Sequence, residues 1–261
     1  VAKPVSLPDI AIGSAKAPIT LTEYSSMSCP HCAAFGQNVF PMLRSKYVDT
    51  GKVRFVFREF PLDIKAAAAS ILARCIGNGD SEKYLGAVET MFKLQERLMA
   101  QTKDTLLYIG KQHGMSEQDV ETCEKDQAQF DKLTADQQYA VRELKVTSTP
   151  TFFLNGVRLQ LHGASIQEDT LGHGDALTPA EFNAAVAAAI DHDVATGHVS
   201  GGRRREQQER AIKVGKIAEP AHRNPLSHRF AGSKDRAAVA AHVYDALRRR
   251  ASSAWLMEAE T

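Results

Sequence analysis

The sequence has few cysteines, little net charge and no long apolar run. Its 261 residues include four Cys, and 32 Lys and Arg offset 31 Asp and Glu to a net charge of +1. Four cysteines are too few for a disulfide-built scaffold in a chain of this length, although they allow two pairs. The balanced charge gives no sign of nucleic acid or a membrane surface as a partner. No apolar run approaches the roughly 18–20 residues of a membrane span.

A signal peptide and an initiator Met are also missing, since the sequence begins Val1-Ala2-Lys3-Pro4. We interpret this start as a processed or trimmed N-terminus, so the missing signal says little about the compartment. The histidines show no spacing typical of metal ligands, and no internal repeat is visible.

The strongest feature that is present is the motif Cys29-Pro30-His31-Cys32, between a strand-like run and a helix-like run. The C-x-x-C spacing puts both sulfurs within one helical turn, where they can form a small disulfide ring. At a helix N-terminus, free N–H groups and the helix dipole favour an anion, which lowers a thiol pKa. A stable thiolate is a good leaving group, so its disulfide is easily reduced. The motif therefore predicts an oxidant that passes its disulfide to another protein.

Each residue of the motif has an expected role. Cys29 is the candidate nucleophile and the more exposed thiol, and Cys32 is the buried resolving thiol. Pro30 suits the first helical turn, and His31 can stabilise the Cys29 thiolate by a hydrogen bond or a positive charge. The alternatives are half of a zinc site and an ordinary surface histidine. Zinc needs two further ligands, and no second C-x-x-C or H-x-x-x-H motif accompanies this one, so we expect no metal and no cofactor.

The N-terminal part reads as a strand–helix–strand unit. Ile19–Ser25 and Lys52–Phe60 have strand patterns, and a short strand is possible at Asp9–Ile12. We expect a helix from Cys29 to Val48, which Pro41 should kink or split near Val39–Phe40.

A helical block follows, with no strand signal over residues 63–145. The expected helices are 65–76, which Gly77-Asn78-Gly79 should end, 81 to about 99, 103–113, one capped by Ser116, and 126 or 127 to 144.

Strand signals then return after Thr149-Pro150. Thr151–Leu154 and Val157–Leu161 flank Asn155-Gly156, which predicts a β-hairpin. Thr178-Pro179-Ala180-Glu181 begins a last helix that should run to about His192.

This order predicts an α/β chain with a thioredoxin-like fold interrupted by an all-helical insertion. The Cys-Pro-His-Cys motif, the Thr-Pro before a strand and the insertion together resemble the DsbA family of bacterial thiol:disulfide oxidoreductases, over roughly residues 10–192. We expect a discontinuous thioredoxin-like domain over 1–62 and 146–192 and a helical insertion over 63–145. The basic tail over 193–261 should be disordered or partly helical.

The tail carries Arg triplets at 203–205 and 248–250, which can be read as nucleic-acid or lipid patches. Without interleaved aromatic residues, and at this net charge, a solvated tail is the preferred interpretation.

The resemblance implies further roles for residues outside the motif. It places the Thr149-Pro150 loop against the two cysteines, with a cis bond before Pro150 and backbone groups open to an extended substrate segment. The alternative is a trans proline that starts an edge strand. It also implies that Glu23 is buried under the site and paired with Arg58, where the pair can relay protons or tune pKa values. The alternative there is a solvent-facing Glu23.

Cys75 and Cys123 lie in the helical block, without C-x-x-C spacing. In a reducing compartment they would be buried free thiols. In an oxidising one they would form a structural disulfide worth roughly 3–4 kcal/mol by loop entropy, which is the pairing we expect.

The function implied by the resemblance is that of a monomeric periplasmic oxidase. It would introduce disulfides into unfolded or reduced secreted proteins and be re-oxidised by a DsbB-type membrane oxidase. The alternatives are a disulfide isomerase or reductase and a non-catalytic chaperone-like binding module. The redox potential and the isomerase or reductase activity distinguish the oxidase from the isomerase or reductase. A Cys29→Ala variant that keeps full function would favour the chaperone-like module.

Overall fold

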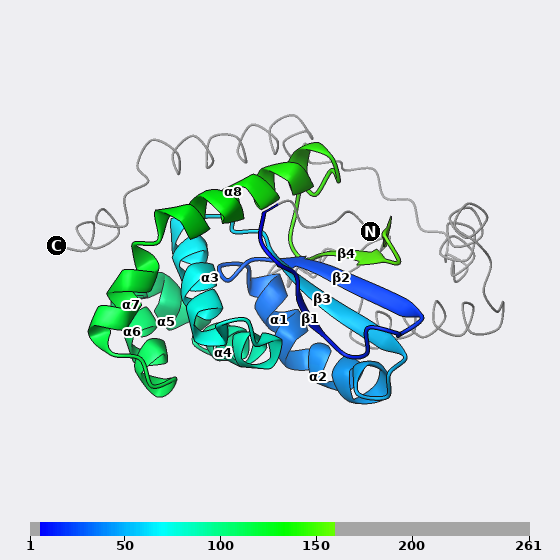
Figure 1. The fold of residues 1–261 in the computed structure, drawn as a ribbon, viewed down its shortest axis with the longest axis horizontal. Helices are drawn as coiled ribbons and strands as arrows, with labels where there is room; N and C mark the ends of the chain where they lie inside the picture. Colours follow the sequence, from blue (N-terminus) through cyan, green and yellow to red (C-terminus); the bar gives the residue numbers. More distant parts are fainter. Residues whose placement is uncertain (1–5, 160–261) are drawn as a thin grey trace, which may run out of the picture.

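The computed structural model describes residues 6–159, so the helix expected at 178–192 and the tail lie outside the described residues. The described strands form one five-stranded sheet in the order β1-β3-β2-β4-β5 (Figure 1). Their bounds are β1 Ile10–Ile12, β2 Ile19–Ser25, β3 Val53–Glu59, β4 Thr151–Leu154 and β5 Val157–Arg158. The strands β2 and β3 are parallel, and the other neighbours are antiparallel. The mixed sheet confirms a βαβ unit followed by a hairpin.

The parallel pair β2–β3 lies at the centre of the sheet and is buried on both faces. Phe55 and Phe57 point to one face and are at most 2% exposed, whereas Tyr24 and Val56 point to the other face and are at most 4% exposed. A strand pair that is buried on both faces needs cover on both of them.

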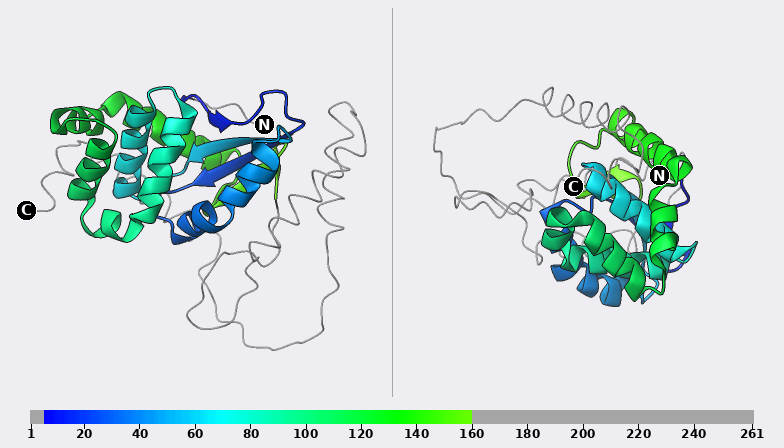
Figure 2. Two further views of the ribbon diagram at one scale, coloured as in Figure 1. Left: turned by 90° about the horizontal axis from the view of Figure 1, so that it is seen from below. Right: turned by 90° about the vertical axis from the view of Figure 1, so that its left-hand side faces the viewer.

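Two helices provide this cover from opposite sides (Figures 1 and 2). On one face, the ring of Phe35 in α1 (Pro30–Asn38) lies 4.7 Å from the ring of Phe152. On the other face, Ala140 of α8 (Gln127–Arg142) belongs to a cluster with Tyr24 and Phe153. Side chains alternate along a strand, so Phe152 and Phe153 point to opposite faces.

The helix expected at Cys29–Val48 breaks at Val39, as the kink at Pro41 predicted. The α1 helix ends at Asn38, α2 spans Phe40–Leu43, and a π-helical turn, η1, spans Arg44–Val48. Pro41 has no N–H to continue the hydrogen-bond ladder.

The described chain over residues 63–145 is helical and contains no strand, as expected. Its helices gather beside one end of the sheet, and α8 returns across a face (Figures 1 and 2). Side chains of Asp63, Asp80, Ser116 and Asp126 accept N–H groups at four helix starts. Before α8, the helices are α3 Ile64–Gly77, α4 Ser81–Lys93, α5 Gln95–Ala100, α6 Thr102–Gln112 and α7 Glu117–Glu124.

One helix boundary in this block was wrong. The single helix expected from Ser81 to about Met99 is two helices, α4 and α5, with a break at Leu94. Leu94 has φ −104° and ψ 18°, outside the helical region. No Gly or Pro lies at the break, so the sequence carried no local signal for it.

The predicted hairpin is present between β4 and β5. Its turn residues, Asn155 and Gly156, have φ 46° and 81°, which is the left-handed conformation that an Asn-Gly turn supplies. The second strand was expected to reach Leu161, but β5 ends at Arg158. Leu161 itself lies outside the described residues.

A single large core joins the sheet to the helical block. It contains Leu21 and Phe55 from the strands, Phe35 from α1, and Leu72 and Met91 from α3 and α4. The division into two domains therefore remains a prediction.

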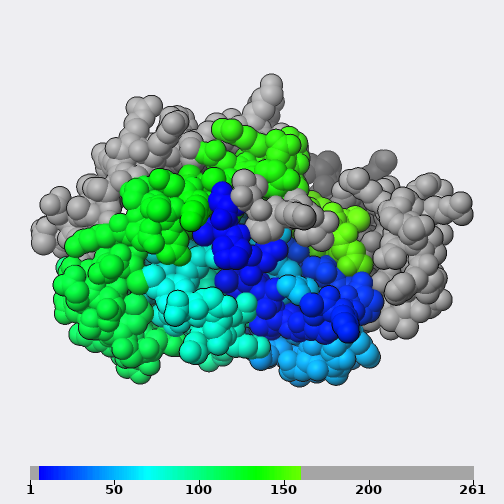
Figure 3. All heavy atoms as spheres, viewed as in Figure 1, coloured from blue at the N-terminus to red at the C-terminus, as the bar shows by residue number. Residues whose placement is uncertain are grey.

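The segment before β1 also ties the two parts together, because it lies across the surface against α8 (Figure 3). There the N–H groups of Ser6 and Leu7 each donate to the Asp136 carboxylate at 2.8 Å.

Candidate active site

Cys29 lies where the loop after β2 enters α1. It is the N-cap of α1, and its Sγ accepts the N–H of Cys32 at 3.4 Å. The same sulfur lies 3.3 Å from the carbonyl oxygen of Thr149, to which the thiol donates. Pro30 occupies the first helical turn, as predicted, and His31 beside it is half-buried. The structure thus brings the motif and the Thr149 loop together at one sulfur.

Cys32 lies one turn into α1 and is fully buried. Its Sγ accepts the N–H of Ser26 at 3.5 Å. Cys29 is also buried, at 3% exposed, and is the more accessible thiol of the two, as expected. Both cysteines are free thiols in this structure, which is the dithiol form.

The two thiols have opposite pKa shifts. The hydrogen bond from the Cys32 thiol is the largest cause that lowers the pKa of Cys29, from 9.0 to about 6. Burial acts in the other direction, while Thr149 and the backbone N–H groups of Cys32 and His31 lower the pKa further. Burial and the neighbouring Cys29 raise the pKa of Cys32 well above its ordinary value. Cys29 is therefore the thiol that ionises, and Cys32 holds its proton.

The Thr149-Pro150 peptide bond is cis, as predicted. Thr149 Oγ1 is buried and has no hydrogen-bond partner among the described residues, so the hydroxyl is available to a thiolate at Cys29. Thr149 thus offers Cys29 a carbonyl oxygen in the thiol form and a hydroxyl in the thiolate form.

Glu23 is buried beneath the site, as the resemblance implied, and is 2% exposed. Its Oε1 has no hydrogen-bond partner in the described chain. Burial is the largest cause that raises the pKa of Glu23, from 4.5 to about 8, with Ser25 acting against it and Cys29 adding to it. The solvent-facing alternative is wrong.

The predicted pairing of Glu23 with Arg58 is also wrong. In the parallel register of β2 and β3, Glu23 lies beside Phe57, and Arg58 lies beside Tyr24. Neighbouring residues on a strand face opposite sides, so Glu23 and Arg58 are on different faces of the sheet.

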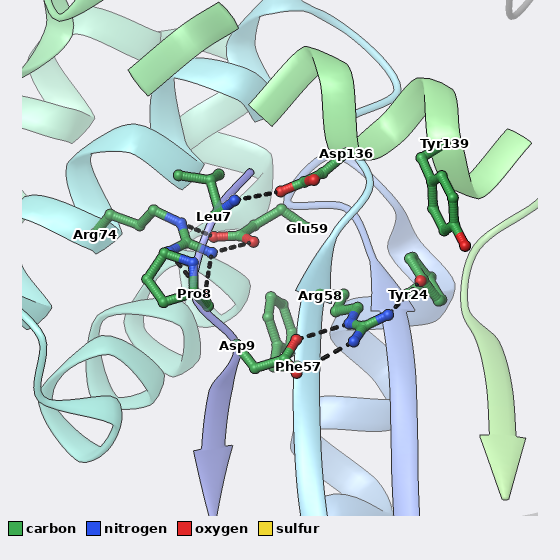
Figure 4. A pocket seen from close by; sticks show the side chains of 10 residues that line it. All are labelled: Leu7, Pro8, Asp9, Tyr24, Phe57, Arg58, Glu59, Arg74, Asp136 and Tyr139. Carbon is green, nitrogen blue, oxygen red and sulfur yellow. Dashed lines mark hydrogen bonds and ion pairs between the residues drawn. The ribbon is translucent and has the colours of Figure 1, made fainter. Parts of the chain in front are cut away.

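Arg58 instead pairs with the segment that leads into β1 (Figure 4). Its Nε and Nη2 donate to the two carboxylate oxygens of Asp9 at 2.8 and 3.1 Å, and its Nη1 donates to the Tyr24 hydroxyl at 2.9 Å. This bidentate pair fixes β1 against the sheet and does not reach the two cysteines.

Two residues near the cysteines were missed by the sequence analysis. Ser26 Oγ accepts the N–H of Leu62 at 3.2 Å, which ties the loop before Cys29 to the segment before α3. Gln95, from α5, donates from Nε2 to the carbonyl oxygens of Met27 at 2.8 Å and Cys29 at 3.0 Å. The run Ser25-Ser26-Met27-Ser28 carried a weak signal as a hydroxyl-rich loop, whereas Gln95 carried none.

Cys75 and Cys123 form a disulfide, as predicted, which joins α3 to α7. Both are half-buried. The free-thiol alternative for these two residues is therefore wrong in this structure.

Two further classes of site were searched for among residues 6–159. No group of three or more His, Cys, Asp or Glu side chains in that range is placed to hold a metal ion. Over the same residues, no helix combines the length and the apolar character that crossing a bilayer requires. The Arg triplets of the tail lie outside the described residues.

The sequence model of the thioredoxin family matches residues 6–188, which is more than half of the chain. The chain belongs to the thioredoxin family.

Among curated relatives, a Rickettsia bellii protein provisionally named a protein-disulfide oxidoreductase is 33% identical over 154 residues, 58% of this chain and 59% of that protein. A Bacillus cereus protein provisionally named disulfide bond formation protein D is 29% identical over 156 residues, 56% of this chain and 69% of that protein. The match thus spans about three-fifths of the length of the Rickettsia relative.

Solved structures place this thioredoxin-family chain with DsbA proteins. The crystal structure of Wolbachia pipientis alpha-DsbA1 has a TM-score of 0.61 and 28% identity, and the match covers 74% of this chain and 96% of that chain. Oxidised BdbD from Bacillus subtilis has a TM-score of 0.53 and 18% identity, over 81% of this chain and 100% of that chain, and shows the fold alone. The expected resemblance to DsbA and the thioredoxin fold with a helical insertion are both confirmed.

Proposed function

We propose that this chain is a periplasmic thiol:disulfide oxidoreductase that introduces disulfides into other proteins through Cys29 and Cys32. The observation that carries the proposal is the contrast between the two thiols. The pKa of Cys29 is lowered to about 6 and that of Cys32 is raised well above its ordinary value. A dithiol with one stable thiolate makes the corresponding disulfide a ready oxidant, because reduction releases that thiolate.

The exchange has two steps and moves two electrons from the substrate to the enzyme. A substrate thiolate attacks Cys29 Sγ of the Cys29–Cys32 disulfide, which forms a mixed disulfide and releases the Cys32 thiolate. The second substrate thiolate then attacks the substrate sulfur of the mixed disulfide and releases Cys29 as a thiolate. The products are a substrate disulfide and the reduced enzyme.

Glu23 can supply the proton that Cys32 takes up when it is released. A carboxyl group with a pKa of about 8 is protonated at neutral pH, and its charged form would raise the pKa of Cys32. Proton donation from Glu23 avoids two negative charges in one buried region.

The proposed compartment and partners follow from the same chemistry. The half-buried disulfide between Cys75 and Cys123 suits an oxidising compartment such as the periplasm. The proposed substrates are unfolded or reduced secreted proteins, and a DsbB-type membrane oxidase would restore the Cys29–Cys32 disulfide. The chain is proposed to act as a monomer, which light scattering of the purified protein tests.

The deciding experiment measures the ionisation of Cys29 and the redox equilibrium of the same protein. Ultraviolet thiolate absorbance of the reduced chain is followed against pH, and the chain is equilibrated with mixtures of reduced and oxidised glutathione. We expect ionisation near pH 6 and a reduced form that is more stable than the oxidised form. Because the folded pKa lies below the ordinary value of 9.0, this extra stability is present at high pH and is lost as pH falls through about 6.

Other results would contradict the proposal in distinct ways. An ordinary thiol pKa, or an oxidised form more stable than the reduced form, would remove the oxidant role. Faster rearrangement of a mispaired substrate than oxidation of a reduced one would favour the isomerase. Full function of Cys29→Ala in cells would favour the chaperone-like module.

A further inference from the structure

The side chain of Gln95, from the helical block, hydrogen-bonds to the loop that carries Cys29. Its Nε2 lies 2.8 Å from the carbonyl oxygen of Met27 and 3.0 Å from that of Cys29. An amide nitrogen has two hydrogens, so both are used by these two acceptors. The opposite orientation would place the amide oxygen against two carbonyl oxygens, so the chemistry of the site selects the nitrogen.

The break between α4 and α5 places Gln95 over this loop. Gln95 is the first residue of α5, directly after the break at Leu94. At the break, the carbonyl oxygen of Phe92 accepts the N–H of Leu94, and Gln37 of α1 also donates to that oxygen at 3.2 Å. The backbone of α1 packs directly against the Phe92 side chain of α4 here, since a Cβ on Gly36 would lie 2.9 Å from the Phe92 ring.

Two glutamines therefore cross the same helix contact in opposite directions. Gln37 reaches from α1 to the end of α4, and Gln95 reaches from the start of α5 to the loop before α1. Only the second of these side chains touches the backbone of a cysteine. The pair thus offers a matched comparison within one interface.

We propose that Gln95 is a positioning residue that fixes the Cys29 sulfur for disulfide exchange, an inference that rests on the proposed role of Cys29. Its two hydrogen bonds fix the Met27–Ser28 and Cys29–Pro30 peptide units, on either side of the Ser28–Cys29 unit, and so set the direction in which the Cys29 side chain leaves the backbone. In that direction Sγ meets the Cys32 N–H at 3.4 Å and lies 3.3 Å from the Thr149 carbonyl. Both contacts depend steeply on distance and angle, so a freely moving loop would weaken them.

The test compares Gln95→Met with Gln37→Met. Methionine keeps a similar length and flexibility but has no N–H to donate, so each variant removes one glutamine's hydrogen bonds. The thiolate absorbance of each reduced variant is titrated, and each is equilibrated with glutathione beside the unaltered chain. Urea unfolding of both redox forms measures the overall stability.

We expect Gln95→Met to raise the pKa of Cys29 and to make the disulfide less oxidising, by about tenfold in the glutathione equilibrium. One pKa unit corresponds to a tenfold change in the thiolate equilibrium. Gln37→Met should leave both quantities unchanged while lowering stability in both redox forms alike. If Gln95→Met fails to fold, Gln95→Asn keeps the amide but is too short to reach both carbonyls, and the same shift is expected.

Two results would overturn the inference. In the first, Gln95→Met ionises and equilibrates like the unaltered chain. In the second, Gln37→Met shifts the thiolate as far as Gln95→Met does, which would assign the effect to helix packing. An ordinary Cys29 pKa in the unaltered chain would instead contradict the proposed function itself, so the two failures are distinguishable.

Discussion

Two buried glutamates on neighbouring strands have opposite surroundings. Glu23 on β2 is 2% exposed and Glu59 on β3 is 6% exposed. Glu59 accepts hydrogen bonds from Arg74 at 2.6 and 2.7 Å (Figure 4). It also accepts a hydrogen bond from the Tyr84 hydroxyl at 2.9 Å. Glu23, which lies near the cysteines, has no partner for its Oε1 among the described residues, and its pKa is raised to about 8.

The difference is between a paired carboxyl group that holds elements together and an unpaired one near the two cysteines. A buried carboxyl group is costly unless it is paired, so its two partners offset the burial of Glu59, and their hydrogen bonds join β3 to α3 and α4. Glu23 has no cation and instead keeps its proton at neutral pH. A polar group left unpaired in a well-packed core is typical of a functional site, and Glu23 lies beside the two cysteines.

The largest expected effect comes from removing Arg74, the cation that pairs with Glu59. Arg74→Leu leaves the Glu59 carboxylate buried without its cation, and loss of one partner of a buried ion pair costs about 3–5 kcal/mol. Urea unfolding of the oxidised chain at neutral pH measures the loss of stability.

Two further variants test whether burial of the ion pair is the reason for the large loss of stability in Arg74→Leu. Arg44→Leu removes an exposed pair with Glu82, whose side chains are 38% and 55% exposed, and should cost less than about 1 kcal/mol. The double change Glu59→Leu and Arg74→Leu should recover part of the stability lost in Arg74→Leu, because no buried charge remains. Equal losses for Arg74→Leu and Arg44→Leu would contradict the assignment.

A smaller effect is expected from replacing Glu23, the unpaired carboxyl group, with a residue that cannot ionise. The folded pKa of Glu23, about 8, lies above its ordinary value of 4.5. The stability linked to its protonation is therefore complete below pH 4.5 and is lost as pH rises through about 8. Glu23→Gln removes this loss, which amounts to at most about 1.4 kcal/mol for each pH unit within the window. Urea unfolding of the variant and the unaltered chain across pH 4–9 gives the difference in slope.

The redox consequence of the same variant can be measured separately. Glu23→Gln should slow formation of the mixed disulfide, the step in which Cys32 takes up a proton, less at high pH than at neutral pH, because Glu23 is already ionised above pH 8. An unfolding profile with the same slope in both proteins would show that Glu23 is not buried in its protonated form.

The local sequence was sufficient to predict much of the fold and the centre of the site. Cys29 and Cys32 follow from the C-x-x-C spacing between a strand and a helix, and the hairpin follows from Asn155-Gly156. Short-range periodicity and turn residues carry these features, so no knowledge of distant contacts was needed.

The errors arose where a long-range contact decides the structure. The break at Leu94 has no Gly or Pro, and the bonds that accompany it come from Gln37 and Gln95 across a helix interface. The partner of Arg58 depends on the register of β2 with β3, which a single sequence does not specify. A shift of one residue in such a register reverses which side chains share a face.

The smallest effect on the thiols is expected at Arg58, which the sequence had placed beside Glu23. Arg58→Met removes the hydrogen bonds to Asp9 and Tyr24 on the far face of the sheet, and should cost about 1–2 kcal/mol of stability. The thiolate titration of Cys29 should not move, because the sheet separates Arg58 from Glu23. A shift of the Cys29 pKa in Arg58→Met would show that Arg58 acts on the thiols after all. Ultraviolet titration of the reduced variant and the reduced unaltered chain in one buffer series distinguishes these results, since only a charge on the face of the cysteines can act on their protons at short range.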